Sequence, residues 1–196
     1  MLHSIKASLK DTYELLRDLM NDPVCLGKIE TVSQLLSDTF QQGGKVIIFG
    51  NGGSACDAMH FAEEFTGRYR DDRKPLPAIA LTDSAHITCV GNDYGFDEIF
   101  SRGIEAYARP GDLVIGISTS GNSSNILKAI HKAKELNCHT FGLLGKDGGK
   151  MKCLCEHEII VRGQTSDRIQ EIHMMVLHII IECVERTMFP NLYSNE

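Results

Sequence analysis

Short apolar runs alternate with longer stretches of helical spacing along this chain. The runs are typical of buried strands, and they predict strands at residues 45–49, 78–81, 113–117, 140–144 and 158–161. Helical spacing between and beyond these runs predicts helices at residues 55–66, 97–108, 126–136 and 167–188. It also covers residues 5–42, where Pro23 and Gly27 are expected to separate two helices.

Alternating strands and helices indicate an α/β fold with a parallel sheet covered on both faces. Right-handed crossovers then predict a doubly wound, flavodoxin-like sheet flanked by helices. We expect one domain over residues 1–196, with residues 1–44 forming an N-terminal helical extension. The last helix is apolar over more than one stripe, so it packs either against other subunits or against its own sheet.

In the segment from Gly116 to Ile126, between a strand and a helix, four small hydroxyl residues surround Gly121. Unpaired amides and the helix dipole at such a position favour an anion. An ordinary N-cap needs one hydroxyl, whereas this segment has Ser118, Thr119, Ser120 and Ser123. It lacks the lysine of a nucleotide P-loop and the glycine pattern of a dinucleotide site. The segment therefore favours the phosphate monoester of a small metabolite.

A second tight turn, Gly50–Ser54, follows the first predicted strand. In a doubly wound sheet, ligands bind outside the carboxyl ends of the strands. Both turns are expected at that edge, so they should share one crevice.

Two helices carry candidate metal ligands. His60 and Glu64 are four residues apart and should share a helix face, which suits a divalent metal or a simple surface contact. On the last helix, Gln170 and His178 lie about 12 Å apart along the axis and differ by roughly 80° in azimuth. That geometry permits a common ligand without requiring one. A histidine among Ile, Leu and Val also suits the core.

Composition restricts the partners. The formal net charge is −6 and the chain has no strong basic tract, which excludes nucleic acid as the expected partner. The basic segment 68–74 is interrupted by two Asp residues, and we expect a solvated loop or an arm that reaches a neighbouring subunit. No apolar run has membrane-spanning length and no signal peptide is visible. Seven Cys without paired Cys-x-x-Cys motifs suggest reduced thiols, five of them buried, in a cytoplasmic protein.

Six motifs together resemble the phosphoheptose isomerases of the sugar isomerase (SIS) fold. They occur in family order over nearly the whole chain: Gly50-Asn-Gly-Gly-Ser54, His60-Phe-Ala-Glu-Glu-Phe-Thr-Gly-Arg-Tyr-Arg70, Cys89-Val-Gly-Asn-Asp93, Gly116-Ile-Ser-Thr-Ser-Gly-Asn-Ser123, Gly145-Lys-Asp-Gly-Gly149 and Asp167-Arg-Ile-Gln-Glu-Ile-His173. The resemblance implies isomerisation of sedoheptulose 7-phosphate to D-glycero-D-manno-heptose 7-phosphate through an enediol. It further implies a homotetramer with active sites between subunits, one Zn²⁺ per subunit, and ADP-heptose synthesis for lipopolysaccharide or another surface polysaccharide.

The resemblance also assigns residues. The acid/base pair would be Glu64 and His178, and the metal ligands His60, Glu64, Gln170 and His178. Substrate contacts would come from Asn51, Gly52, Gly53, Glu64, Asn92, Asp93, Ser118, Thr119, Ser120, Ser123 and Gln170. Arg68 and Asp167 are further candidate contacts, and the segment 162–166 matches the family less well.

Three alternatives remain open at this point. One is a non-catalytic SIS-fold protein that binds the bacterial replication initiator, which the retained Glu64 and His178 disfavour. Another is a sugar-phosphate sensor domain, although this acidic chain leaves no room for a DNA-binding unit. The third is an isomerase for another sugar phosphate, because no residue measures the carbon count of the substrate.

Overall fold

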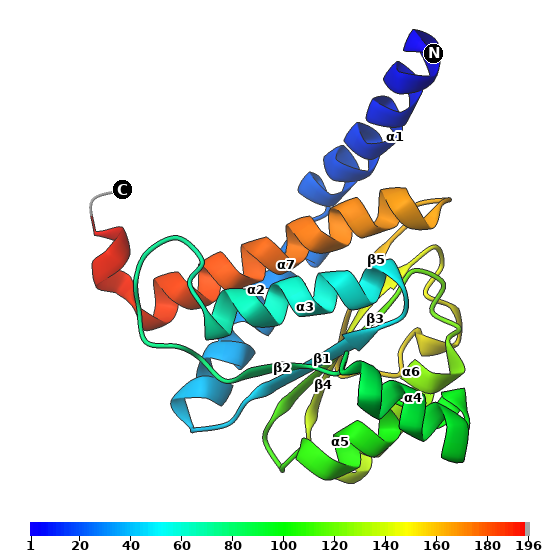
Figure 1. Cartoon of the computed structure of the whole chain (residues 1–196). Helices are drawn as coiled ribbons and strands as arrows, with labels where there is room; N and C mark the ends of the chain where they lie inside the picture. Colours follow the sequence, from blue (N-terminus) through cyan, green and yellow to red (C-terminus); the bar gives the residue numbers. More distant parts are fainter. Residues whose placement is uncertain (195–196) are drawn as a thin grey trace.

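A five-stranded parallel sheet forms the centre of the protein, and the computed structural model describes residues 1–194 (Figure 1). The strand order is β2-β1-β3-β4-β5, the flavodoxin-like order that the sequence predicts. The strands are β1 (Val46–Gly50), β2 (Ala78–Ala80), β3 (Leu113–Ser118), β4 (His139–Gly145) and β5 (His157–Val161). Because β1 and β3 are covered by helices on both faces, every residue in them is buried, which explains their continuous apolar runs.

Residues 1–194 also form seven α-helices and short 3-10 turns. The helices are α1 (Leu2–Met20), α2 (Pro23–Gln41), α3 (Gly53–Thr66), α4 (Ser84–Asp93), α5 (Ser101–Tyr107), α6 (Ser124–Glu135) and α7 (Ser166–Met188). The turns are η1 (Phe96–Glu98), η2 (Gly149–Met151) and η3 (Pro190–Tyr193). One core lies between the sheet and α2, α3 and α7, and the other lies beneath α4, α5 and α6. This doubly wound arrangement confirms the expected α/β class.

Three local predictions need correction. Gly27 lies inside α2; the break falls earlier, where Asp22 accepts hydrogen bonds from the amides of Val24 and Cys25 and Pro23 opens the helix. The helix expected over 97–108 divides into η1 and α5. The helix α4 was not predicted, because Val90 is the one buried residue among its ten and no apolar stripe marks it.

The last helix buries most of its apolar surface within its own chain. Ile172, Val176 and Ile180 are fully buried in the core beneath α2 and α3, whereas Ile179 remains 38% exposed. Packing against its own sheet therefore explains most of the wide apolar face.

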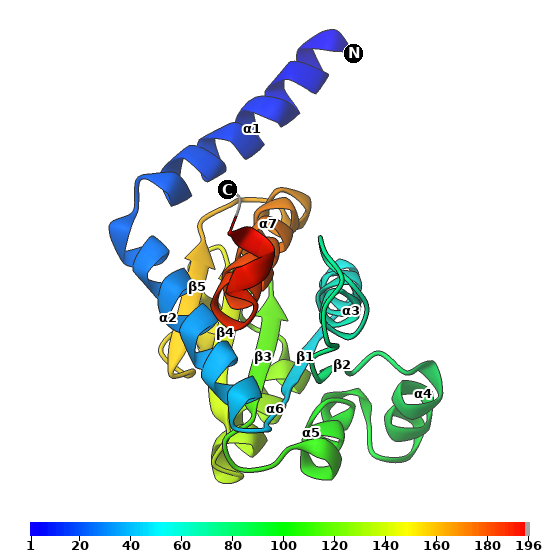
Figure 2. The same ribbon diagram turned by 90° about the vertical axis from the view of Figure 1, so that its left-hand side faces the viewer.

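The first helix, in contrast, projects from the body of the molecule (Figures 1 and 2). Its Leu2 and Leu9 side chains are each 65% exposed. No helix within residues 1–194 combines the length and apolar character that crossing a bilayer requires.

The cysteines only partly follow the prediction. All seven are free thiols. Cys25 and Cys138 are buried as expected, but Cys56 and Cys89 are exposed, because they lie on outward faces of α3 and α4.

Candidate active site

Two ligand-binding turns meet at the carboxyl edge of the sheet. β1 and β3 pair directly, with Gly50 opposite Ile117, so the turns that follow them are neighbours. Two asparagines join these turns through reciprocal amide bonds: Asn51 donates to Asn125 over 3.0 Å, and Asn125 donates back over 2.9 Å. The shared crevice that the topology predicts is therefore present.

The loop between β3 and α6 is shaped by its own hydroxyl groups. Ser118 is buried and accepts a 3.0 Å hydrogen bond from the amide of Gly121. Its hydroxyl lies 3.3 Å from that of Ser123, the N-cap residue of α6. Ser123 makes no side-chain cap bond to this helix within the described residues, and the Asn125 side chain accepts the amide of Ile126. The amides of Ser124 and Asn125 therefore remain available to an anion.

Gly121 fixes the outer wall of this loop. Its φ is +63°, and a Cβ there would lie 1.9 Å from the carbonyl oxygen of Gly148. The amide of Met151 donates to the Gly121 carbonyl over 3.0 Å. The glycine-rich segment 145–149 thus packs directly on the loop, and a side chain at Gly121 would separate them.

The start of α7 closes the crevice from the helix side. The side-chain amide of Gln170 donates to the hydroxyl of Ser54 over 3.4 Å. A Cβ at Gly53 would lie 2.6 Å from that same side-chain amide, so a larger residue there would displace the Gln170 side chain. Thr119 also contacts α7, with its hydroxyl 3.1 Å from that of Ser166. Both turns and the first turn of α7 therefore contact one another.

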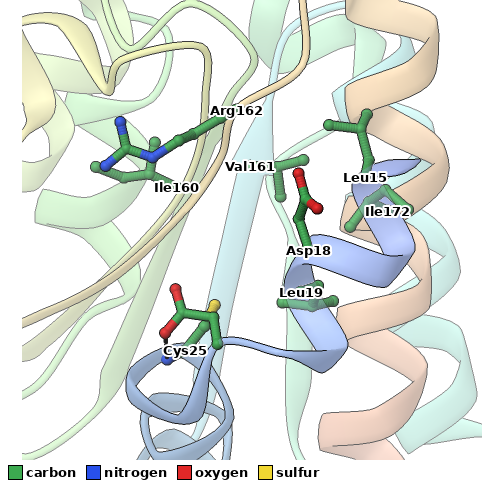
Figure 3. A pocket seen from close by; sticks show the side chains of 9 residues that line it. Leu15, Asp18, Leu19, Cys25, Ile160, Val161, Arg162 and Ile172 are labelled. Carbon is green, nitrogen blue, oxygen red and sulfur yellow. Dashed lines mark hydrogen bonds between the residues drawn. The ribbon is translucent and has the colours of Figure 1, made fainter. Parts of the chain in front are cut away.

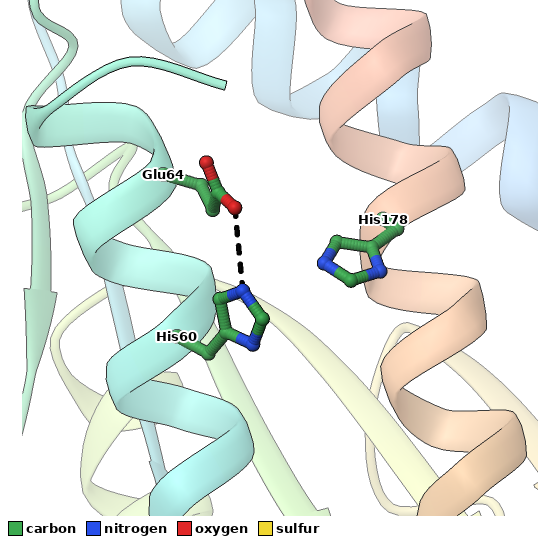
Figure 4. Close-up of side chains that lie close together, drawn as sticks. All are labelled: His60, Glu64 and His178. Atoms are coloured by element: carbon green, nitrogen blue, oxygen red, sulfur yellow. Dashed lines mark hydrogen bonds and ion pairs between the residues drawn. The ribbon is translucent and has the colours of Figure 1, made fainter. Parts of the chain in front are cut away.

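A second group of side chains lies between α3 and α7, which run side by side (Figure 1). Ligand atoms of His60, Glu64 and His178 all lie within 4.8 Å of one another (Figure 4). His60 Nε2 is 3.2 Å from Glu64 Oε1, and the two imidazole rings meet edge to face at 5.0 Å. Here the structure brings together residues 114 positions apart (178 minus 64).

The environment of this triad favours a neutral imidazole at His178. Burial, and then the neighbouring His60, lower the pKa of His178, while Glu64 opposes them. One turn before His60, burial raises the pKa of Asp57 to about 6, opposed by His60. A neutral imidazole is the form that can accept a proton or bind a metal.

Two imidazoles and a carboxylate are a donor set that suits Zn²⁺. The triad therefore fits a divalent metal. Gln170 is not part of the group in this chain, since its amide contacts Ser54, which precedes His60 by about 9 Å of helix. Its expected role as a fourth ligand stays a prediction, whereas its position beside the β1–α3 turn suits substrate contact.

Other predicted contacts lie farther from these turns. Asn92 and Asp93 end α4, are exposed, and bond to each other over 2.7 Å. Arg68 is exposed just beyond the C-terminal end of α3. Asp167, in the first turn of α7, pairs with Arg168 over 3.1 Å. Within residues 1–194, no hydrogen bond or ion pair joins these four side chains to the β3–α6 loop or to the triad, so their roles remain predictions.

A partly open cavity of about 90 Å³ lies elsewhere, between α1, α2, β5 and α7 (Figure 3). Leu15, Leu19 and Ile172 line it together with Asp18 and Arg162. None of the residues with predicted chemistry reaches it, so it is not the candidate site.

Sequence reasoning missed Asn125. Its side chain is 2% exposed, and its oxygen also accepts the amide of Ile126 over 2.9 Å. A polar residue between the serine loop and the apolar positions of α6 is the signal that could have revealed it. Its partner Asn51 was predicted, but the pairing depends on the sheet order.

Comparison with known proteins agrees with this geometry. A sequence profile for the SIS domain matches residues 15–145. The chain is 58% identical to a phosphoheptose isomerase of Fusobacterium nucleatum, over 97% of this chain and 98% of that protein. A phosphoheptose isomerase of Vibrio cholerae is 50% identical over 94% and 97% of the two chains. A solved phosphoheptose isomerase from Francisella tularensis has a TM-score of 0.89 at 32% identity, covering 94% of this chain and 98% of that one.

In each of these three comparisons the similarity covers nearly the whole length of both proteins. The SIS profile separately covers both turns and the triad residues on α3. The chain therefore belongs to the phosphoheptose isomerases of the SIS domain family.

Proposed function

We propose that this enzyme converts sedoheptulose 7-phosphate to D-glycero-D-manno-heptose 7-phosphate. The observation that carries the proposal is the convergence of Glu64 and His178 from two helices, beside His60 and within 4.8 Å. Aldose–ketose isomerisation needs a base for carbon and a second group for oxygen, and this pair supplies both.

The phosphate would bind at the loop between β3 and α6. Ser118, Thr119, Ser120 and Ser123 offer hydroxyl donors there, and the uncapped amides of α6 add backbone donors. Asn51, Gly52 and Gly53 in the neighbouring turn, together with Gln170, would hold the sugar hydroxyls. Binding energy at this remote end would orient C1 and C2 for reaction.

Glu64 would take the proton from C1 of the ketose and return it to C2. Its side chain is only 14% exposed, which limits competition from water. His178, kept neutral by its lowered pKa, would move the proton between O1 and O2 of the enediol.

A divalent metal held by His60, Glu64 and His178 would polarise the sugar carbonyl and so acidify the C1–H bond. We propose Zn²⁺ on the donor set, with Gln170 as a further ligand in the assembled enzyme. A carboxylate that binds metal strongly is a weaker base, so Glu64 would serve either as ligand or as base at any one moment.

We further propose a homotetramer in which the helices of residues 1–44 form subunit contacts. The exposed Leu2, Ile5 and Leu9 side chains of the projecting α1 support self-association. Seven free thiols support a reducing, cytoplasmic location. The substrate would connect the enzyme to ADP-heptose synthesis for lipopolysaccharide or another surface polysaccharide. Asn92 and Asp93 remain proposed substrate contacts.

The alternative, a non-catalytic protein that binds the replication initiator, is not favoured. Relatives at 50–58% identity are isomerases, and this chain keeps the carboxylate and both histidines of the triad.

The test is a coupled assay with pentulose, hexulose and heptulose phosphates, each with and without a chelator. We expect turnover of the heptulose phosphate alone, lost on chelation and restored by Zn²⁺. Turnover of another ketose in preference would overturn the substrate assignment, and turnover unaffected by chelation would overturn the metal.

A further inference from the structure

A buried ion pair crosses between the loop after α3 and the end of α7. Arg73 Nε donates to Glu185 Oε1 over 2.7 Å, with the side chains 1% and 0% exposed. The hydroxyl of Tyr193 in η3 donates to the other carboxylate oxygen over 2.7 Å. The sequence suggested that segment 68–74 is solvated or intermolecular, so a buried Arg73 corrects that expectation for this residue.

The remaining donors of Arg73 bind the C-terminal end of α3. Nη2 donates to the carbonyl of Glu64 over 2.6 Å, and Nη1 donates to that of Phe65 over 2.7 Å. Carbonyls in the last turn of a helix have no partner within the helix, and a cation there also complements the helix dipole. Arg73 therefore holds the backbone of the very residue whose side chain belongs to the triad.

Glu185, the other member of the ion pair, lies on the same face of α7 as His178 of the triad. Glu185 follows His178 by seven residues on α7, so the two side chains differ by only about 20° in azimuth. They are about 10 Å apart along the helix axis. The contact between Arg73 and Glu185 thus fixes the position of α7 along its axis relative to α3. This axial offset decides whether His178 faces His60 and Glu64.

Stability alone gives a weak reason for such a pair. A buried ion pair is often no more stabilising than apolar residues of similar volume, because both charges lose their hydration. The guanidinium, however, can bind a carboxylate and two carbonyls at fixed angles, which an apolar contact or a lysine cannot do.

We propose that Arg73, held by Glu185 and Tyr193, is a positioning residue that keeps Glu64 in register with His178. The inference rests on the proposed isomerase function of the triad.

The decisive variant removes all three polar groups together: Arg73→Met/Glu185→Leu/Tyr193→Phe. No buried charge is left unpaired, so we expect it to fold with a Tm near that of the wild type. We call the contacts of Arg73 with Glu185 and with the C-terminal end of α3 the clamp. Without the clamp, kcat should fall by about tenfold or more, since small misplacements of reacting groups cost this much. KM should change little, because the phosphate loop is not touched.

A control ion pair lies between the residues that directly precede β1 and β3. There Lys45 and Asp112 form an ion pair of 2.6 Å with side chains 22% and 2% exposed. The Asp112 carboxylate also accepts the backbone amides of Lys45 and Arg109 over 2.9 and 2.7 Å. The variant Lys45→Met/Asp112→Asn removes both charges but keeps a side-chain oxygen for one of these amides. It does not touch α3 or α7, so its kcat should stay within about twofold of the wild-type value. An equal loss of kcat in this control would overturn the proposal.

Hydrogen exchange supplies a readout that does not depend on activity. Amides of residues 60–67 should exchange faster in the triple variant than in the wild type and the control. Arg73→Lys, which keeps a charge opposite Glu185, should show the same changes in kcat and exchange to a smaller extent. If the triple variant does not fold, Arg73→Lys tests the proposal in its place. Wild-type kcat and wild-type exchange in a folded clamp variant would overturn the inference. A wild-type protein without isomerase activity would overturn the proposed function instead, while exchange would still test the clamp.

Discussion

The β3–α6 loop and the His60–Glu64–His178 triad are built in different ways. The loop is shaped mainly by contacts between near neighbours, such as Ser118 with Gly121 and with Ser123. The triad joins α3 to α7, and its two helices are held in place by a core that spans the chain. A local motif can therefore specify a phosphate site, whereas acid/base chemistry here depends on how two helices pack.

The comparison also separates binding from chemistry. If the loop grips the phosphate and the triad moves protons, changes in the loop should raise KM and changes in the triad should lower kcat. Three predictions test this division, and a fourth tests the contrast between the two histidines of α7; they run from the largest expected effect to the smallest.

The largest effect is expected for Glu64→Gln. Loss of the base should lower kcat by about a thousandfold, in the range typical of general acid/base catalysis, while KM changes little. Steady-state kinetics with the heptulose phosphate measure this. The control is Glu105→Gln, an exposed carboxylate on α5 that should leave turnover unchanged. Near-wild-type turnover in Glu64→Gln would remove Glu64 from the mechanism.

His178→Gln should lower kcat by about a hundredfold, because an amide cannot exchange a proton between the two oxygens of an enediol. His131→Gln, an exposed histidine on α6, serves as the control. A variant that unfolds easily but retains its kcat when folded would identify His178 as a core residue and contradict the assignment.

The double variant Ser118→Ala/Ser120→Ala should affect KM instead of kcat, raising KM by about thirtyfold or more while kcat stays nearly unchanged. Two hydroxyl donors to a charged phosphate are lost, and each is worth roughly 1 kcal/mol or more. Ser124→Ala is the matched control, because this neighbouring hydroxyl donates to Asp97 instead. An unaltered KM in the double variant would place the phosphate elsewhere.

The smallest effect concerns the other histidine of α7. His173 is fully buried and lies 2.9 Å from the Leu144 carbonyl, and burial lowers its pKa to about 4. An unfolded chain therefore binds a proton below pH 6.5 that the folded protein refuses, so stability falls as the pH falls through that window. This group should lower the free energy of unfolding by about 1 kcal/mol between pH 7 and pH 5.5.

Urea titrations at both pH values measure that change. His173→Gln keeps an amide donor for Leu144 and should flatten the pH dependence. An identical pH dependence in the variant would show that other groups control acid stability. The result would sharpen the contrast within α7 between a histidine of the core and a histidine of the triad.

Much of the fold was accessible from patterns that are local in the sequence. Five apolar runs predicted all five strands, and helical spacing predicted most of the helices, because period and burial are directly linked. The predicted helix boundaries were wrong, or a helix was missed, where local sequence signals conflict or are absent. Gly27 is tolerated inside α2 because a capping residue, Asp22, already defines where the helix begins. The helix α4 buries so little that it has no apolar period to detect.

The sequence by itself determined the α/β class, the serine-rich loop and the pairing of His60 with Glu64, since each depends on residues close together in the chain. Only the tertiary structure decided that His178 completes the triad, that Gln170 lies at the β1–α3 turn, and that Arg73 is buried against Glu185. These three depend on the offset between α3 and α7. That offset results from side-chain packing between two helices that lie about a hundred residues apart in the sequence, and no local pattern encodes it.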